Sequence, residues 1–339
     1  MKRNLYILFL KKLSFKKLLN TCRVYASYYL SVFFKYSKRR GYPLSISVEP
    51  TTTCNLQCPE CPSGNGELTR FRGDIDLSLF KKITDEFAPY LLNLILYFQG
   101  EPFLNKEIFK LFEYASVTKK IFTTTSTNGH YLNSENAEKT VKSGLDKIII
   151  SIDGTTQDIY EQYRKNGQLN TIIKGINNLV YWRKKLQYST PYIVIQFIVF
   201  RFNEHQINDI KKLSKELKAD KLELKSAQIY DFTKNSHLIP TNSKYSRYKR
   251  NTDGNYEIKS RLKNRCKRLW ESTVITNTGD VLPCCFDKDA QYISGNLKDK
   301  DFAEINNNET IISFRRKLLK NRKQIDICRN CTEGLYNTK

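Results

Sequence analysis

Short apolar runs alternate with helix-like stretches between residues 44 and 226, and this alternation constrains the fold more than any other feature. The apolar runs are rich in β-branched residues, which strands prefer. The intervening stretches carry helix signals, such as Asp76 at an N-cap position and Gly144 at a stop position. The expected strands are residues 44–48, 93–98, 120–125, 147–152, 192–200 and 221–224. The expected helices are residues 77–90, 106–117, 134–143, 176–186 and 204–217. Strands joined through helices run parallel, so the pattern predicts an α/β fold, built as an open doubly wound sheet or as a partial barrel.

Changes in composition divide the chain into four expected parts. Residues 1–43 form a basic amphipathic N-terminal segment, and residues 44–235 hold the β/α units. Residues 236–264 are a polar stretch that we expect to be a linker. Residues 265–339 contain five cysteines and a hairpin-like sequence at 273–282. A part of about seventy residues with so many cysteines predicts a small domain organised around metal rather than around a large core.

The N-terminal segment concentrates positive charge in a chain that has 57 Lys and Arg against 34 Asp and Glu, a net charge of +23. Residues 1–48 contain 11 Lys and Arg and no Asp or Glu. Their longest uncharged run, 24–34, is far shorter than the ~20 residues that span a bilayer, and no signal-peptide cleavage pattern is present.

Three interpretations of this segment stay open. A solvated helix could pack its apolar face on the β/α domain. Residues 1–40 could instead make peripheral contact with an anionic membrane surface, which would place a cytoplasmic protein at the inner face of the membrane. The positive charge could also bind an acidic peptide; nucleic acid is the partner we expect least.

Nine cysteines, an odd number and mostly grouped, do not suit a secreted disulfide framework. They fit metal ligation in a reducing compartment, and three histidines leave little room for a His-based site. Directly after the first strand, Cys54, Cys58 and Cys61 form a Cys-x3-Cys-x2-Cys pattern. Three thiolates on one loop can hold three irons of a four-iron cluster and leave the fourth open. The alternatives are a zinc site that lacks one ligand, or buried thiols that behave as small hydrophobes.

Unusual polar motifs follow the next three expected strands. Residues 99–102 are Gln-Gly-Glu-Pro, residues 126–129 are Ser-Thr-Asn-Gly, and residues 151–154 are Ser-Ile-Asp-Gly. Each could be an ordinary turn by itself. Because the carboxyl ends of parallel strands meet at one edge, we expect these motifs and the cysteine loop to form one site.

Together these motifs, over residues 44–226, resemble the radical S-adenosylmethionine (SAM) superfamily. The resemblance implies a partial (β/α)6 barrel similar to a TIM barrel, a 4Fe-4S cluster on Cys54, Cys58 and Cys61, and SAM chelated by the open iron. It also implies positions that contact SAM. These are Gly100, Glu101 and Pro102 for the ammonium group, Asn128, Ser151 and Asp153 near the ribose, and Arg164 for the carboxylate. The chain departs from the family pattern at Glu60, where many members have an aromatic residue, and at Gln99, where many have glycine.

The C-terminal cysteines, Cys266, Cys284, Cys285, Cys328 and Cys331, have spacings that allow a four-cysteine zinc site. With the Leu-Trp pair at 269–270 and Gly279 four residues before Cys284, they also resemble the SPASM extension of radical SAM enzymes, which binds auxiliary iron-sulfur clusters. That resemblance implies one auxiliary 4Fe-4S cluster on Cys266, Cys284, Cys328 and Cys331, with Cys285 as the alternative to Cys284. Cys22 is not expected to be a ligand.

The resemblance implies an iron-sulfur-dependent oxidoreductase or modifying enzyme. It would cleave SAM reductively to a 5′-deoxyadenosyl radical and take hydrogen from a peptide, a protein or a small molecule. A reductant protein such as a flavodoxin or ferredoxin would supply electrons. The catalytic acid or base is not identified, and Asp231, Lys225 and Gln228 are candidates only by their position after the sixth strand. The alternative function is a non-catalytic, zinc-stabilised binding protein with a basic arm for an acidic partner or a membrane surface.

Overall fold

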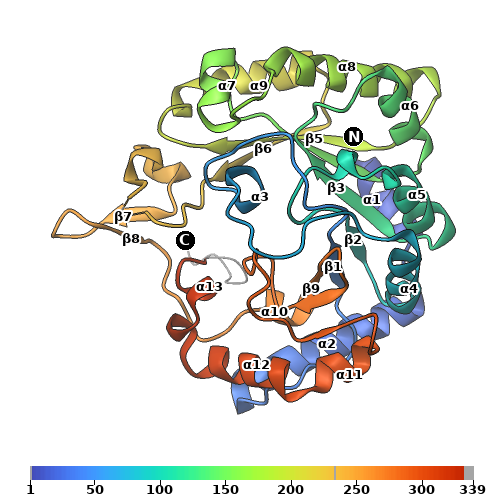
Figure 1. The fold of residues 1–339 in the computed structure, drawn as a ribbon, viewed down its shortest axis with the longest axis vertical. Helices are drawn as coiled ribbons and strands as arrows, with labels where there is room; N and C mark the ends of the chain where they lie inside the picture. Colours follow the sequence, from blue (N-terminus) through green and yellow to red (C-terminus); the bar gives the residue numbers. More distant parts are fainter. Residues whose placement is uncertain (1, 233, 332–339) are drawn as a thin grey trace. The chain divides into compact units, whose positions relative to one another are not determined.

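A computed structural model describes residues 2–232 and 234–331 of the chain, which divides into two compact units (Figure 1). The first unit comprises residues 1–5, 54–67 and 124–261, and the second comprises residues 6–53, 68–123 and 262–339. The last part of the expected cysteine-rich domain, residues 332–339, lies outside the described residues.

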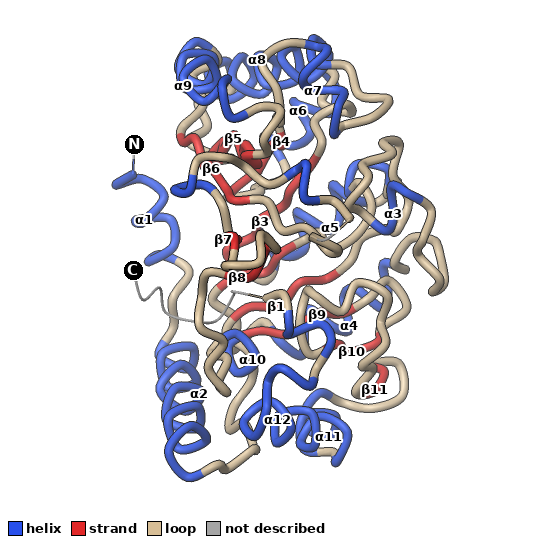
Figure 2. The backbone as a smooth tube through the Cα atoms, turned by 90° about the vertical axis from the view of Figure 1, so that its left-hand side faces the viewer, coloured by secondary structure: helices blue, strands red, loops and turns tan. Residues whose placement is uncertain are grey.

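Parallel strands with helical connections form the first unit. Its strands pair in the order β3, β4, β5 and β6, all parallel, with Thr124 opposite Lys147 and Val194 opposite Lys221. Helices α6 to α9 cover one face of these strands (Figures 1 and 2). The elements are α3 (Pro62–Asn65), β3 (Phe122–Thr127), α6 (Ser134–Lys142), β4 (Lys147–Ser151), α7 (Gln157–Tyr163), α8 (Leu169–Lys185), β5 (Tyr192–Val199), η3 (Glu204–Gln206), α9 (Ile207–Glu216) and β6 (Lys221–Ser226).

The stretch expected to be a linker carries secondary structure of its own. It begins with two short 3-10 helices, η4 (Ser236–Leu238) and η5 (Ser243–Tyr245). A two-stranded antiparallel hairpin follows, β7 (Tyr248–Arg250) with β8 (Tyr256–Ile258). The side chain of Tyr248 is buried, so this polar sequence still contributes to a core.

The second unit is built around β1 (Ser45–Val48). This strand runs parallel to β2 (Asn93–Ile95) on one side and to β9 (Ser272–Ile275) on the other. The expected C-terminal hairpin therefore extends the sheet of β1, with β10 (Asp280–Leu282) antiparallel to β9 and β11 (Gly295–Asn296) antiparallel to β10.

The helices of the second unit surround these strands. Asp76 caps α4 as expected, because its Oδ1 accepts the backbone N–H groups of Ser78 and Leu79 at 2.8 and 3.2 Å. The elements are α1 (Lys2–Lys11), α2 (Phe15–Phe34), α4 (Leu77–Phe87), η1 (Pro102–Leu104), α5 (Ile108–Glu113), the π-helix η2 (Tyr114–Thr118), α10 (Arg268–Glu271), α11 (Phe302–Asn307), α12 (Glu309–Asn321), η6 (Arg322–Gln324) and α13 (Asp326–Arg329).

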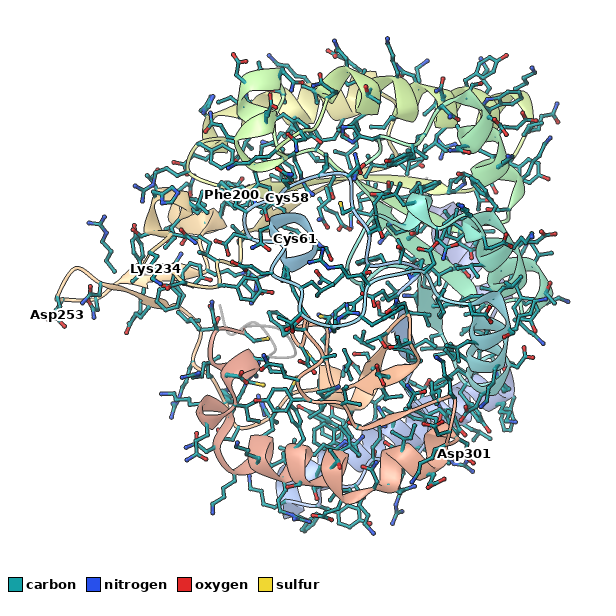
Figure 3. All side chains as sticks on the ribbon, viewed as in Figure 1. Cys58, Cys61, Phe200, Lys234, Asp253 and Asp301 are labelled. Atoms are coloured by element: carbon teal, nitrogen blue, oxygen red, sulfur yellow. The ribbon has the colours of Figure 1, made fainter. Side chains whose placement is uncertain are left out.

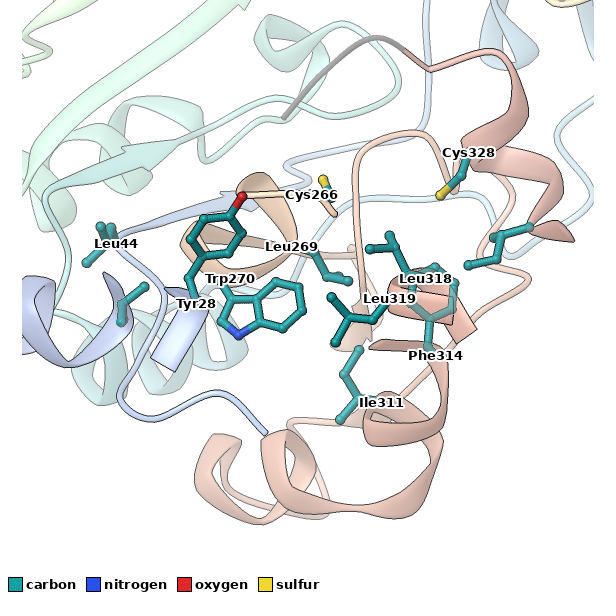
Figure 4. Packing of buried hydrophobic residues seen from close by; sticks show 12 residues of the cluster. Tyr28, Leu44, Cys266, Leu269, Trp270, Ile311, Phe314, Leu318, Leu319 and Cys328 are labelled. Carbon is teal, nitrogen blue, oxygen red and sulfur yellow. The ribbon is translucent and has the colours of Figure 1, made fainter. Parts of the chain in front are cut away.

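A buried cluster joins the N-terminal helix α2 to the C-terminal helices of the second unit. Trp270 is fully buried at its centre, with Tyr28 of α2 edge-on at 5.7 Å between ring centroids. Cys266 and Cys328 belong to the same cluster, and their sulfur atoms lie at its rim in Figure 4. The mostly parallel strands of both units confirm the expected α/β class.

Candidate functional site

The first cysteine loop, residues 54–61, is held by close backbone packing. Cys58 is buried, whereas Cys54 and Cys61 are half-buried. Cys61 precedes the short helix α3, and its backbone N–H donates to the carbonyl of Cys58 at 3.1 Å. A Cβ atom on Gly64 would lie 2.8 Å from the backbone nitrogen of Cys58, so only glycine allows α3 to approach the loop this closely.

Two predicted polar residues of the first unit contact the thiols of this loop. The Asn128 amide lies 4.0 Å from Cys54 Sγ and donates to Asn55 Oδ1 at 2.8 Å. Arg164 Nη1 lies 3.8 Å from Cys58 Sγ. Asn128, from the end of β3, is thus brought to the cysteine loop as the strand-end argument predicts, and Arg164, which only the family resemblance implied, reaches the loop from the end of α7.

Asp153 orients Arg164. Its Oδ2 accepts Arg164 Nε at 2.6 Å, and its Oδ1 accepts the backbone N–H of Ile198 at 2.7 Å. Burial opposes the charge on Arg164, but the Asp153 carboxylate and Cys58 raise the Arg164 pKa well above its usual value. Burial in turn raises the pKa of Cys58, and the positive charge of Arg164 acts against that shift. Ser151, the other predicted polar residue here, is buried at the end of β4.

The predicted loop of Gly100, Glu101 and Pro102 packs against the residues that lead into the cysteine loop. Gly100 has φ +72°, and a Cβ atom there would lie 2.4 Å from the carbonyl oxygen of Thr51. The backbone N–H of Glu101 donates to the carbonyl of Thr53 at 2.7 Å. Glu101 and Pro102 are buried, and Gly100 is half-buried. Glycine is therefore required at position 100 by this close approach.

A buried carboxylate that the sequence reasoning missed lies directly after β1. Glu49 is fully buried and pairs with both terminal nitrogens of Arg70. Its two oxygens also accept the backbone N–H groups of Gln99 at 3.3 Å and Asn277 at 3.2 Å. Burial raises the pKa of Glu49, and the ion pair with Arg70 opposes this. Glu49 is the first acidic residue of the chain, which is the signal that could have identified it.

Arg70 extends this connection toward the C-terminal cysteines. Its Nε donates to the carbonyl of Lys288 at 3.0 Å, three residues after Cys285. The pair of Glu49 and Arg70 therefore connects three segments of the second unit. These are the segment before Gly100, the turn between β9 and β10, and the segment after Cys285.

Glu60, where the chain departs from the family pattern, has a structural partner. It is buried, and its carboxylate accepts the backbone N–H of Tyr230 at 2.9 Å and the Asn235 side chain at 2.7 Å. The cysteine loop is thereby tied to the segment that follows β6. Of the acid or base candidates in and after β6, Lys225 is exposed, Gln228 is half-buried, and Asp231 accepts the backbone N–H of Lys234 at 3.1 Å.

The C-terminal cysteines gather around a buried arginine. Arg322 donates to the carbonyl of Arg265 at 3.1 Å and to that of Cys331 at 3.0 Å. It therefore holds together the chain next to Cys266 and the chain at Cys331. Cys328 and Cys331 lie in one turn, with a backbone hydrogen bond of 3.3 Å.

The pKa values of these thiols also reflect their mutual proximity. Burial raises the pKa of Cys328 to about 12, with Cys266 and Cys331 contributing. A hydrogen bond with Cys285 and burial raise the pKa of Cys284 far above its usual value, and Cys331 and Cys266 add to the shift. The four predicted ligands thus act on one another electrostatically.

Whether these residues fit iron-sulfur clusters is decided by the chemistry of the donors. Within residues 2–232 and 234–331, no three His, Cys, Asp or Glu side chains are grouped closely enough to hold a metal ion. The nine cysteines are all free thiols. Each predicted cluster position has an arginine beside it, the half-buried Arg164 or the buried Arg322, which suits a negatively charged thiolate-bound cluster. The donors therefore fit by their chemistry, although among the described residues they are not drawn together into a complete site, and the ligand sets remain predictions.

Two families match the chain. The family described as the radical SAM superfamily matches residues 48–215. The SPASM family, described as an iron-sulfur cluster-binding domain, matches residues 266–332.

Curated relatives are identical to the chain at about a quarter of the aligned positions. The PqqA peptide cyclase of Bradyrhizobium diazoefficiens is 27% identical over 292 residues, covering 80% of this chain and 72% of that protein. The GTP 3′,8-cyclase of Desulforamulus reducens is 27% identical over 54% of this chain and 54% of that protein. The mycofactocin maturase MftC of Mycobacterium ulcerans is 26% identical over 51% of this chain and 44% of that protein. The chain spans about half the length of the latter two relatives.

Solved structures share the fold. Streptococcus suis SuiB bound to S-adenosylmethionine has a TM-score of 0.62 and 17% identity, covering 86% of this chain and 74% of that chain. BtrN in complex with AdoMet and 2-DOIA has a TM-score of 0.52 and 18% identity, covering 86% of this chain and 94% of that chain. At such low identity the likeness concerns the fold alone.

Proposed function

Because the chain belongs to the radical SAM superfamily and carries a SPASM iron-sulfur domain, we propose that it is an enzyme that modifies a peptide or protein by radical chemistry. When bound, a 4Fe-4S cluster supplies the electron that cleaves SAM to methionine and a 5′-deoxyadenosyl radical, which takes a hydrogen atom from the substrate. The observation that supports this most is the convergence of Asn128, Asp153 and Arg164 on the loop of Cys54, Cys58 and Cys61.

The chain's own residues would bind and orient the reactants. Cys54, Cys58 and Cys61 would hold the SAM-binding cluster. Gly100, Glu101 and Pro102 would present backbone and carboxylate groups to the SAM ammonium, a role that their packing against residues 51–53 supports. Asn128, Ser151 and Asp153 would lie at the ribose.

Arg164 is proposed to pair with the SAM carboxylate. Its bond to Asp153 leaves Nη1 beside Cys58, so the guanidinium stays charged at the position where an anionic group would bind. In the SPASM domain, Cys266, Cys284, Cys328 and Cys331 would hold the auxiliary cluster, with Arg322 fixing two of the segments that carry them.

A peptide substrate is supported by the relatives. The PqqA peptide cyclase and the mycofactocin maturase are named for peptide-directed or maturation reactions, and the former covers most of this chain. A flavodoxin or ferredoxin is proposed as the electron donor. The test is anaerobic reconstitution followed by iron and sulfide counting: about eight irons per chain are expected for two four-iron clusters. One zinc ion and no iron would instead favour the zinc-stabilised binding protein.

The N-terminal helix α2 supports a membrane-surface location. Its apolar side chains recur at helical spacing on the solvent face, where Phe15 and Phe33 are each 75% exposed and Leu19 and Tyr29 lie between them. In the described residues no helix is long and apolar enough to cross a bilayer. This exposed apolar stripe is separate from the face of α2 that carries Val24 and Tyr28, which packs in the buried cluster of the second unit.

Small and polar side chains fix α2 in this orientation. Ser27 and Ser31 are fully buried and donate to carbonyls of their own helix. Buried Asn20 makes two hydrogen bonds of 2.9 Å with the backbone of Tyr42. Rotating the helix to bury its phenylalanines would break the two Asn20 bonds with Tyr42. Figure 2 shows α2 beside α10 at the edge of its unit.

We propose that this face lies on an anionic membrane surface, at the inner side of the membrane. Exposed apolar side chains and a segment without acidic residues up to position 48 combine apolar burial with attraction to anionic lipid.

A further inference from the structure

A basic hollow lies in the segment between β5 and the SPASM domain. It encloses about 450 Å³ and is lined by Arg201, by the residues before β7 and by the β7–β8 hairpin. Four of its lining side chains are cationic: Arg201, Lys249, Arg250 and Lys259. None of the described residues that line it is Asp or Glu. A hollow with this lining attracts anions.

Among the residues that the structure describes, one of the four cations forms an ion pair with a carboxylate. Lys249 pairs with Glu257 across the hairpin at 3.0 Å, where both side chains are half exposed. Lys259 instead donates to the hydroxyl of Ser243 at 2.9 Å, and burial lowers its pKa.

The two arginines contact neutral groups. Arg201 Nε donates to the carbonyl of Ile239 at 2.9 Å, and its Nη2 lies 3.1 Å from the hydroxyl of Tyr256. Arg250 lies over the Tyr256 ring at 5.2 Å. A hydrogen bond with Arg250, helped by the charge of Arg201, lowers the pKa of Tyr256. Two carboxylates lie beside the hollow, Glu257 on Lys249 and Glu204 on the backbone N–H of Thr241, so four cations face two neighbouring carboxylates and an excess of positive charge remains.

The hollow adjoins the first cysteine loop. Tyr248, which lines it, belongs to one buried cluster with Cys58 and Phe200, and Tyr256 and Cys61 pack against this cluster. Figure 3 shows Cys58, Cys61 and Phe200 close together. Arg201 follows β5 at the carboxyl end of the strand, the same edge at which Asp153 follows β4.

We propose that this hollow binds the carboxylate side chains of an acidic segment of the peptide substrate. The inference rests on the proposed function, because it assigns the substrate class of that same site. The volume of the hollow is within the range of ligand-binding pockets and exceeds what a single phosphate fills. Its cations come from several chain segments, so several carboxylates can bind at once.

Fluorescence anisotropy of full-length protein with fluorescein-labelled hexaglutamate tests this inference. Arg250→Gln combined with Lys259→Gln should weaken binding about tenfold, because two charge-assisted contacts are lost. Arg250→Lys combined with Lys259→Arg keeps both charges and should bind nearly as the wild type does. The matched control is Lys212→Gln with Lys215→Gln, which removes two exposed charges from α9 and should leave binding within about twofold.

Several results would overturn the inference. One is an equal weakening of hexaglutamate binding by the glutamine substitutions at Arg250 and Lys259 and by those of the α9 control, which would indicate a nonspecific charge effect. Another is binding of inorganic pyrophosphate that depends on Arg250 and Lys259 while hexaglutamate does not bind. SAM cleavage is measured separately on reconstituted protein and distinguishes the two proposals. Cleavage of SAM without hexaglutamate binding rejects only the proposal that the hollow binds an acidic segment. Absence of SAM cleavage by the wild type rejects the proposed function.

Discussion

Replacing Glu49 with glutamine should destabilise the protein strongly although it changes only one atom. The amide keeps the shape of the side chain but removes the charge that faces Arg70, whose side chain is 10% exposed. Leaving one member of a buried ion pair without its partner costs about 3–5 kcal/mol. The backbone N–H groups of Gln99 and Asn277 also lose a charged acceptor. We therefore expect a loss of at least about 3 kcal/mol, a large share of the ~5–15 kcal/mol that stabilises a typical protein.

Urea unfolding followed by circular dichroism measures this loss. The matched control is Glu135→Gln, which breaks the exposed pair with Lys139 on α6 and should cost less than about 0.5 kcal/mol. Combining Glu49→Gln with Arg70→Met should recover part of the loss, because no unpaired buried charge remains. If Glu49→Gln costs no more than Glu135→Gln, the buried pair does not fix the loops around it.

Three further predictions concern other parts of the chain. Phe15→Ala combined with Phe33→Ala should reduce co-sedimentation with phosphatidylglycerol-containing vesicles at least about tenfold without loss of stability. The control is Phe71→Ala, which also removes an exposed ring and should leave co-sedimentation unchanged. Equal effects of the two changes would contradict the role of α2. Burial, together with the charge of Lys12, lowers the pKa of Lys17 to about 8. Unfolded Lys17, with a pKa near 10.4, keeps its proton above pH 8, whereas folded Lys17 loses it. In urea unfolding, the stability of the wild type relative to Lys17→Met should therefore rise by about 2 kcal/mol from pH 7.5 to 9.5, and an unchanged difference would contradict the lowered pKa. Cys284→Ala should lose about four irons and Cys285→Ala should retain them, because the Cys266 and Cys331 thiols lie near enough to Cys284 to raise its pKa. The reverse result would exchange the two assignments.

Local patterns predicted the β/α elements well, because strand and helix signals act over a few residues. The expected strand at 147–152 is β4, and the Asp76 cap is present. The placement of Asn128 and Asp153 near the cysteine loop also followed from the parallel topology, whereas Arg164 was expected only from the family resemblance.

Long-range packing was not predictable from the same patterns. Helical periodicity shows that α2 is amphipathic but not which face is buried, and the structure buries the face that carries Asn20, Val24, Ser27, Tyr28 and Ser31. The pairing of Ser45 with Ser272 joins strands more than two hundred residues apart, which no local signal encodes. The bond between Glu49 and Arg70 depends on burial of both groups, and the hairpin β7–β8 arises in a polar sequence in which Tyr248 is buried.

The central claim is that the Cys54–Cys61 loop supports reductive cleavage of SAM. Its most direct test is the quantification of 5′-deoxyadenosine by mass spectrometry after anaerobic incubation of reconstituted protein with SAM and dithionite. The wild type should release 5′-deoxyadenosine and Cys58→Ala should release none, while Cys22→Ala, a cysteine outside both clusters, should match the wild type. No 5′-deoxyadenosine from a wild type that contains iron, or undiminished release from Cys58→Ala, would contradict the claim.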